Sequence, residues 1–302
     1  MLAIIAPGQG SQTPGMFNSW MQDPTLRGLL ESWSDAIGLD LLHLGTNADA
    51  EEIKDTANAQ PLIVAASLLG AHALGIKNFA VTSGHSVGEL TAAALSGAIS
   101  ENDALRIVRT RGIEMAKAAA TSPSGMSAVL GGDRTEVLAA IAALQLVAAN
   151  DNGAGQIVAA GELQALASLS ENPPTGARVR SLAVAGAFHT QFMQPAVQPL
   201  RELAATITTH PVSIQVISNK DGQVVTDGAE VLNRIVNQIA NPVRWDLCME
   251  TLKSLGVTGV IELPPAGTLV GLLKRAAGDI ETFALKSVDE LDAAREFAGR
   301  HL

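Results

Sequence analysis

The stretch "NFAVTSGHSVGELTAAA", residues 78–94, joins a strand-like run to a helix-like run through a serine that has a glycine two residues away on each side. The apolar residues 78–84 predict a buried strand, and the Ala- and Leu-rich residues 87–100 predict a helix. In a GxSxG pattern the glycines relieve crowding at a sharp strand-to-helix turn and leave the serine hydroxyl exposed. Ser86 is therefore a candidate nucleophile, and we expect Glu89 to place its charge in the first helical turn, where it suits the helix dipole.

Strand-like and helix-like runs alternate along the rest of the chain, which predicts an α/β fold. Residues 2–6 and 78–84 have the composition of central parallel strands, and later strands are expected at 215–219 and 259–263. The longest uncharged stretch, residues 56–76, is interrupted by polar residues and a proline, and its apolar part is shorter than a membrane span of about 20 residues. We expect it to form a buried helix.

Residues 124–186 have a pattern of their own, with runs typical of strand, helix, two strands, helix and strand. This is the order of a ferredoxin-like unit. The sequence therefore predicts a small ferredoxin-like domain at 124–186, inserted into a large α/β-hydrolase-like domain with a parallel sheet, which comprises residues 1–123 and 187–302.

Composition excludes several classes of protein. Among 302 residues, 20 Lys and Arg stand against 30 Asp and Glu, and a formal charge of −10 argues against nucleic acid as a partner. Cys248 is the one cysteine, so a disulfide within the chain and a multi-cysteine metal site are excluded. The N-terminus lacks the basic leader of a signal peptide. We expect a cytoplasmic protein without a membrane segment.

A nucleophilic serine needs a base, and histidine is the usual one at neutral pH. Of six histidines, His189 lies where the chain leaves the small unit and re-enters the larger one, at a seam where sites tend to form. His85 adjoins Ser86 and should point elsewhere, and His301 is expected to fray with the C-terminus. His189 is the preferred base, although sequence alone fits a capping or buried structural histidine equally well.

Attack on an acyl carbonyl also requires hydrogen-bond donors for the oxyanion. One should be the main-chain N–H of Val87, directly after the nucleophile. A second should come from the loop after the first strand, "PGQGSQ" at 7–12, where the main chain around Gln9 is flexible. The loop lacks the spacing of a phosphate-binding motif, and its alternative interpretation is an ordinary glycine-rich turn.

Six motifs together resemble the malonyl-CoA:acyl carrier protein transacylase family. They occur in one order over nearly the whole chain: "APGQGSQTPGM" (6–16), "QPLIVAA" (60–66), "GHSVGE" (84–89), "GMSAVLG" (125–131), "GAFH" (186–189) and "NPVRW" (241–245). The resemblance implies a ping-pong acyl transfer in which Ser86 accepts a malonyl group and His189 is its base. It also implies that the main-chain carbonyl of Gln238 orients the imidazole, with Gln9 and Val87 as oxyanion donors.

The same resemblance assigns the acyl-selecting residues. Arg111 matches the family arginine that holds the malonyl carboxylate, a task suited to a planar guanidinium, although on composition alone it could be a solvated helix charge. Phe188 matches a size filter that favours malonyl over branched groups. Asn150 and Asn152 resemble a polar stretch that contacts the phosphopantetheine-bearing partner.

The expected partners are malonyl-CoA and an acyl carrier protein, and the expected state is a monomer with no metal and no bound organic cofactor. Because an acidic carrier would meet an acidic chain, we expect a local basic patch near the cleft, formed by Arg178 and Arg180 or by Lys274 and Arg275.

Two other hypotheses remain open from the residues. GxSxG alone is compatible with a serine hydrolase or thioesterase, which would need an acidic residue to orient its histidine; the sequence nominates none. Alternatively, the small unit could dock a carrier protein without catalysis, with Ser86 incidental.

Overall fold

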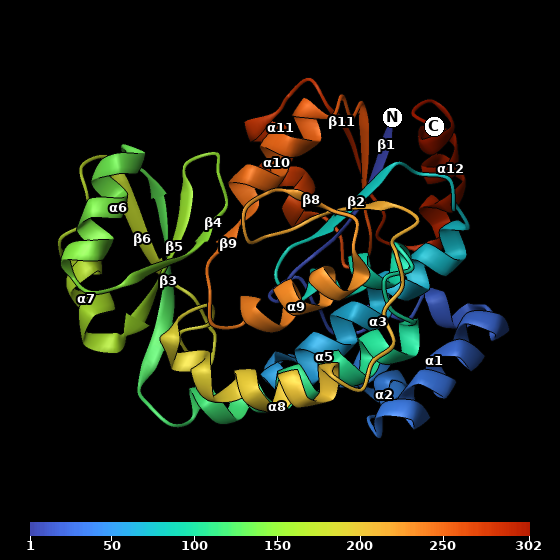
Figure 1. The fold of residues 1–302 in the computed structure, drawn as a ribbon, viewed down its shortest axis with the longest axis horizontal. Coiled ribbons are helices and arrows are strands. Elements are labelled where there is room, and N and C mark those ends of the chain that lie inside the picture. The colour runs from blue at the N-terminus through green and yellow to red at the C-terminus, as the bar shows by residue number, and fades with distance from the viewer.

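The computed structural model describes residues 1–302 and contains twelve α-helices and eleven β-strands in two sheets (Figure 1). The larger sheet has the strand order β11-β10-β1-β2-β7-β8, and all its neighbours are parallel except the β7–β8 pair. The smaller sheet has the order β6-β3-β5-β4-β9. The strands are β1 (Leu2–Ala6), β2 (Val81–Gly84), β3 (Ser124–Gly131), β4 (Val147–Asp151), β5 (Gln156–Glu162), β6 (Ala177–Ser181), β7 (Gln215–Ile217), β8 (Val224–Val225), β9 (Val243–Arg244), β10 (Gly259–Glu262) and β11 (Glu281–Ala284).

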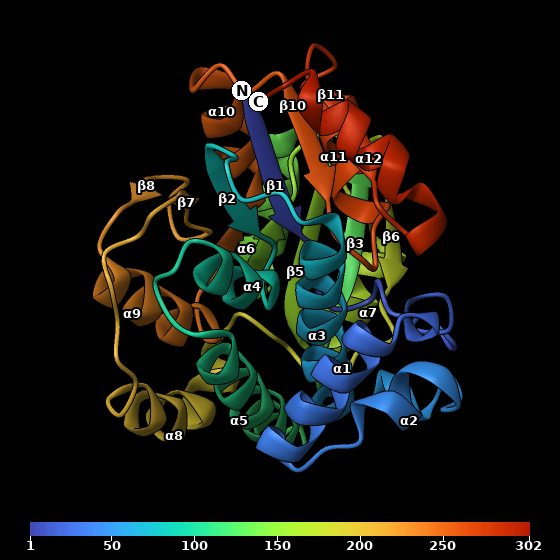
Figure 2. The ribbon, with the colours of Figure 1, turned by 90° about the vertical axis from the view of Figure 1, so that its right-hand side faces the viewer.

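Helices cover both faces of the larger sheet and one face of the smaller one (Figure 1, Figure 2). They are α1 (Pro24–Ile37), α2 (Leu41–Thr46), α3 (Thr56–Leu74), α4 (Gly88–Leu95), α5 (Glu101–Ala119), α6 (Arg134–Ala143), α7 (Leu163–Glu171), α8 (Gln194–Ala204), α9 (Gly228–Gln238), α10 (Trp245–Ser254), α11 (Thr268–Ala276) and α12 (Leu291–Gly299).

Strand β1 shows why the larger sheet is buried on both faces. Its side chains alternate: Leu2 and Ile4 join the main core with α3, α4 and α5, whereas Ala3 and Ile5 join a second core with α10 and α11. Every residue of β1 is buried, as a central parallel strand with period-two side chains requires. The carboxyl ends of β1 and β2 meet at one edge of this sheet, which brings the loop after β1 next to the turn after β2.

Helix α3 is long and apolar enough to cross a membrane by composition, but 72% of its apolar window is buried inside the fold. It begins at the N-cap Asp55, whose carboxylate accepts from the N–H of Ala57, and ends at Gly75 in the left-handed conformation. It packs beside α5 and α1 (Figure 2). The expectation of a buried helix over 56–76 is confirmed.

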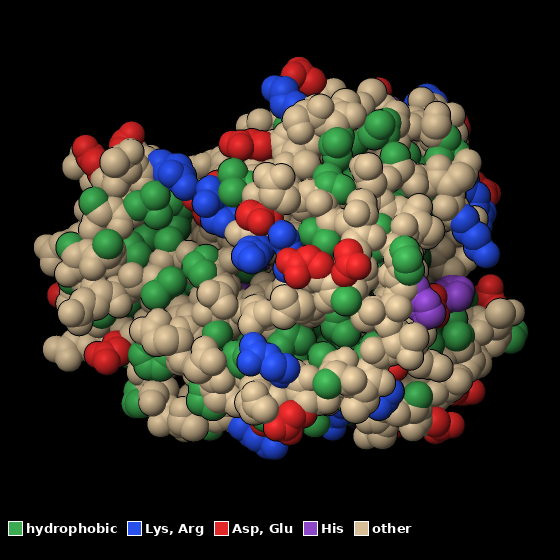
Figure 3. All heavy atoms as spheres, in the orientation of Figure 1, with side chains coloured by type: hydrophobic (Ala, Val, Ile, Leu, Met, Phe, Trp, Pro, Cys, Tyr) green, Lys and Arg blue, Asp and Glu red, His purple; other side chains and the backbone are tan.

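In the smaller sheet, β3, β4, β5 and β6 pair antiparallel, with α6 and α7 packed on one face (Figure 1). Strand β9 pairs parallel to β4 at the edge of this sheet, although it comes from the chain between α9 and α10. Strand β9 was not expected from the sequence, because a run of two residues carries no periodicity. Figure 3 shows the surface hollowed between the lobe of the small sheet and the rest of the molecule.

Three local expectations differ from the structure. Strand β2 begins at Val81 rather than residue 78, and the helix after Ser86 ends at Leu95 because Gly97 adopts a left-handed φ of 77°. His301 does not fray: it is 6% exposed, and its Nδ1 lies 3.0 Å from Thr258 Oγ1. Packing of α12 against the body of the fold extends order to the penultimate residue.

Candidate active site

Ser86 occupies the turn between β2 and α4 with a left-handed φ of 53°, a strained conformation for a residue that has a side chain. A Cβ at Gly84 would overlap the main chain of Gly88, and a Cβ at Gly88 would overlap the carbonyl of Ala6. Both glycines therefore permit an approach of strand and helix that no other residue allows. The turn expected from the GxSxG pattern is present in the structure.

His189 lies 103 residues after Ser86 in the chain, and its Nε2 is 2.8 Å from Ser86 Oγ. Its Nδ1 is 2.9 Å from the main-chain oxygen of Gln238 at the end of α9. A carbonyl can only accept, so Nδ1 carries the proton and Nε2 is free to accept from the serine hydroxyl. His189 also has a left-handed φ, of 62°. The structure thus brings together three of the residues named from the sequence.

Burial, and after it the positive charge of Arg111, together lower the pKa of His189 to about 3, against the raising effect of the bond to Gln238. The imidazole is therefore neutral across the physiological range, in the form that can accept a proton from Ser86. An acidic side chain does not contact His189; the main-chain carbonyl stands in the position that a carboxylate has in hydrolase triads.

Arg111, on α5, is 1% exposed and is held by two amide oxygens rather than by a carboxylate. Its Nη1 donates to Gln60 Oε1 at 2.7 Å and its Nη2 to Gln238 Oε1 at 2.9 Å. Nη2 also lies 3.3 Å from Ser86 Oγ, and the buried Nε has no partner. Burial lowers its pKa to about 10, which leaves it charged at neutral pH. A fixed cation with unused donor capacity therefore faces the nucleophile.

The expected oxyanion donors lie beside Ser86. The main-chain N–H groups of Gln9 and Val87 make no hydrogen bond within the chain. Gln9 lines the cavity that contains Ser86, and its side chain donates to Thr56 Oγ1 and accepts from Gln60. Val87 is buried at the first turn of α4.

A cavity of about 270 Å³ opens onto Ser86 between the two sheets. One wall comes from the larger sheet and its helices, and the other from β4, β5 and the segment after β6. Phe188, Asn150 and Asn152 all line it, and His85 turns away from Ser86 to bond Asn152 Oδ1 at 2.8 Å. No group of three or more His, Cys, Asp or Glu side chains is placed to hold a metal ion.

Sequence reasoning missed three residues of the site. Gln60 supports Arg111, and a glutamine inside an apolar helix was a usable signal. Asn219 follows β7, and its Oδ1 accepts from the N–H of Ser86 at 2.8 Å. Glu89 lies in the first turn of α4, as expected, but its place in the site was missed: its side chain is 3% exposed and accepts from Asn219 and Gln238.

Comparisons with known proteins agree with this geometry. The acyl transferase domain family matches residues 4–291. Malonyl CoA-acyl carrier protein transacylase of Mycobacterium tuberculosis is 52% identical over 297 residues, which cover 97% of this chain and 98% of that one. The crystal structure of MCAT from M. tuberculosis superposes with a TM-score of 0.95 at 51% identity and covers 98% of this chain and 99% of that one.

A further solved structure, a malonyl-transacylase in complex with its type II PKS acyl-carrier protein, has a TM-score of 0.92 at 28% identity, with 98% of this chain and 99% of that one covered. The fold and the family match define an acyltransferase. The chain belongs to the acyl transferase domain family and, within it, to the malonyl CoA-acyl carrier protein transacylases.

The strain at Ser86 gives a stability prediction. We expect Ser86→Gly to unfold with a free energy about 1 kcal/mol higher than Ser86→Ala, because glycine adopts a left-handed φ without the penalty of a Cβ. Chemical denaturation of the two inactive variants measures the difference. Ser96 is the control position, because its φ of −77° is ordinary for a residue with a side chain. There the alanine variant should be more stable than the glycine variant. If the glycine variant is the more stable one at both positions, backbone strain at Ser86 does not explain the difference.

The charge of Arg111 gives a titration prediction. Since that charge lowers the pKa of His189, Arg111→Met should raise the His189 pKa from about 3 toward its ordinary value of 6.5. The imidazole would then become protonated, and lose its function as a base, at a higher pH than in the wild type. NMR titration of the ring, assigned with His189→Gln, measures the midpoint; an unmoved midpoint would exclude Arg111 as a cause.

Proposed function

We propose that this enzyme transfers the malonyl group of malonyl-CoA to the phosphopantetheine thiol of an acyl carrier protein through a malonyl ester on Ser86, and so supplies fatty-acid elongation. The observation that carries this is the buried, charged Arg111, whose Nη2 lies 3.3 Å from Ser86 Oγ. A cation fixed next to the nucleophile suits an acyl group that ends in a carboxylate.

In the first half-reaction, Ser86 Oγ attacks the thioester carbonyl while His189 Nε2 takes the hydroxyl proton. The carbonyl of Gln238 stabilises the imidazolium through Nδ1–H. The oxyanion forms beside the main-chain N–H groups of Gln9 and Val87, whose lack of internal partners supports this role. Collapse breaks the carbon–sulfur bond, and His189 returns the proton to the departing CoA thiolate.

In the second half-reaction, the carrier's phosphopantetheine thiol gives its proton to His189 and its sulfur attacks the malonyl ester. The ester bond to Ser86 breaks, and the imidazolium protonates the serine oxygen, which restores the resting enzyme. Exclusion of water from the malonyl ester would favour transfer over hydrolysis, and Ser86 lies within the cavity between the sheets, where a bound carrier arm would displace water.

Selection of the acyl group is assigned to two cavity residues. Arg111 holds the malonyl carboxylate by its free donor positions. Phe188 is 5% exposed and lines the cavity directly before His189, where its ring limits the size of a substituent on the acyl chain. Asn150 and Asn152 line the opposite wall, where the pantetheine arm would run.

We also propose a division into two domains. Residues 1–123 and 187–302 form a large α/β-hydrolase-like domain, and residues 124–186 form a small ferredoxin-like domain. The protein is proposed to be a cytoplasmic monomer. The strand order β6-β3-β5-β4 with two helices on one face supports the ferredoxin-like assignment.

We assign the docking site of the carrier protein to four cationic side chains beside the cavity. They are Arg178 and Arg180 on β6, and Lys274 and Arg275 at the end of α11. All four are exposed, and none of them takes part in the ion pairs of the chain. Residues directly after β6 and residues of α11 line the cavity. These cations are therefore available to an acidic partner whose arm enters there.

The decisive measurement of function is intact-protein mass after mixing with malonyl-CoA. We expect the wild type to gain one malonyl group, Ser86→Ala to gain none, and added acyl carrier protein to discharge the ester. Arg111→Ala should lose at least tenfold in malonyl loading relative to acetyl loading, since only malonyl presents a carboxylate. An ester that decays to free malonate regardless of carrier would indicate a thioesterase, and no ester at all would favour a docking module.

Charge reversal tests the carrier surface. The pairs Arg178→Glu/Arg180→Glu and Lys274→Glu/Arg275→Glu are compared with Lys117→Glu on the exposed side of α5. We expect at least one of the two double variants to transfer malonyl from preloaded enzyme to the carrier about tenfold more slowly than the wild type at low salt. At high salt, where charges are screened, the variant and the wild type should transfer at similar rates. Unchanged transfer in both pairs would refute this docking surface.

A further inference from the structure

Glu89 is a buried carboxylate that the reaction above does not use. It lies three residues after Ser86 on α4, and its side chain is 3% exposed. Its Oε1 accepts from the N–H of Asn219 at 2.6 Å, and its Oε2 accepts from Gln238 Nε2 at 2.6 Å. Both oxygens face N–H donors, so the ionised form fits the site. Burial raises the pKa of Glu89 to about 7, against the Asn219 bond and the charge of Arg111.

Gln238 connects this carboxylate to the reacting groups. Its side-chain Nε2 donates to Glu89, and its Oε1 accepts from Arg111 Nη2 at 2.9 Å. Its main-chain oxygen lies 2.9 Å from His189 Nδ1. An amide has a donor end and an acceptor end, and a carboxylate can only accept. Nε2 also lies 3.1 Å from the main-chain oxygen of Ser86 and 3.1 Å from Asn219 Oδ1, but its bond to Glu89 is the shortest. Glu89 is therefore the main acceptor that keeps the NH2 end of the amide away from the guanidinium of Arg111.

Asn219 forms the second arm from Glu89. Its Nδ2 donates to the carbonyl of Gly84 at 2.7 Å, and its Oδ1 accepts from the N–H of Ser86 at 2.8 Å. These two bonds hold the main chain on either side of the nucleophile turn. Its own N–H is directed to Glu89, so the carboxylate orients the residue that braces Ser86.

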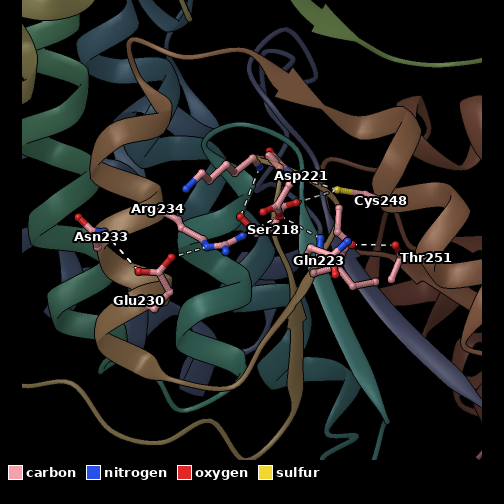
Figure 4. Close-up of polar contacts among 12 residues, drawn as sticks. Ser218, Asp221, Gln223, Glu230, Asn233, Arg234, Cys248 and Thr251 are labelled. Atoms are coloured by element: carbon pink, nitrogen blue, oxygen red, sulfur yellow. Dashed lines mark hydrogen bonds and ion pairs between the residues drawn. The ribbon is translucent and has the colours of Figure 1, made fainter.

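The turn that carries Asn219 is itself clamped by two helices (Figure 4). From α9, Arg234 pairs with Asp221 at 2.7 Å and with Glu230 at 2.7 Å. From α10, Thr251 Oγ1 donates to the carbonyl of Gly222 at 2.7 Å. Figure 4 shows Arg234 and Thr251 on opposite sides of the turn, so the turn that follows Asn219 is held from both helices.

We propose that Glu89 is a positioning residue for acyl transfer: its carboxylate sets the amide of Gln238, and through it the guanidinium of Arg111, so that the site selects an acyl group bearing a carboxylate. The proposal rests on the function proposed above. Glu89 is also the buried carboxylate nearest in the network to Arg111, and its ionised form offsets the charge of Arg111 across the Gln238 amide, because Arg111 has no carboxylate in direct contact.

The test replaces the carboxylate with an amide of the same shape. Glu89→Gln has one acceptor oxygen for two facing donors, the main-chain N–H of Asn219 and Nε2 of Gln238. Because the main-chain N–H cannot turn away, the amide oxygen stays with it, and the Gln238 amide loses its shortest acceptor and with it the fixed orientation toward Arg111. We expect the ratio of malonyl to acetyl loading rates, measured from intact-protein mass against time, to fall at least tenfold. A ratio within twofold of the wild type would overturn the proposal.

A double-mutant cycle identifies the route. Gln238→Met keeps the main-chain carbonyl but removes the amide, so the same ratio should fall, and adding Glu89→Gln should lower it no further. Additive losses would mean that Glu89 does not act through Gln238. If Glu89→Gln does not fold, Gln238→Met alone decides the matter: an unchanged ratio overturns the proposal.

Glu262→Gln is the matched control. Glu262 is another fully buried carboxylate, but it accepts from main-chain N–H groups of residues 267–270 only. We expect it to lower the melting temperature and leave the malonyl-to-acetyl ratio unchanged; an equal fall in both variants would make the effect generic and overturn the proposal.

A neutral fluorophosphonate that labels Ser86 separates the two proposals. If the wild type is labelled but accepts no malonyl group, the proposed function fails. The role of Glu89 is then tested by the rate at which the fluorophosphonate labels Ser86. A labelling rate at least tenfold lower in Glu89→Gln than in the wild type supports the positioning of Ser86 and His189 by Glu89. A labelling rate within twofold of the wild type overturns it.

Discussion

A guanidinium held out of water beside Ser86, the proposed nucleophile, is the constraint around which the site is organised. Burying an unpaired charge is costly, and Arg111 is 1% exposed. Two glutamine oxygens and the more distant Glu89 offset that cost without occupying every donor, so the cation stays charged and partly unsatisfied. An acyl group with its own carboxylate would complete the set. Several polar residues that look unrelated in the sequence therefore belong to one network.

The same charge accounts for the form of the base. With a cation this close, an imidazolium is disfavoured, and burial adds to the effect, so His189 rests neutral. A carboxylate paired directly with the imidazole would favour the charged form and would compete for Arg111. A main-chain carbonyl orients the ring without adding a net charge. The negative charge is instead placed one amide further away, at Glu89.

Periodicity was sufficient to predict most strands, the buried helix and the Ser86 turn, because each depends on local residue types. His189 was preferred as the base of Ser86 because it lies at the seam between the two units, and the motif resemblance supported that choice. The bond to the Gln238 carbonyl came from the resemblance alone, since segments so far apart in the chain leave no local signal. The roles of Gln60, Asn219 and Glu89 in the site were missed for the same reason: their partners are set by tertiary packing. Strand β9 was missed because it is defined only by the neighbour it pairs with.

The position of β9 has a mechanical consequence. It pairs with β4 of the small sheet, yet it follows Gln238 after the short segment 239–242. One wall of the cavity is thus tethered to the carbonyl that bonds the imidazole of His189. A rotation of the small sheet that opened the cavity would pull on that carbonyl. Strand β9 therefore couples the separation of the two cavity walls to the orientation of the His189 ring.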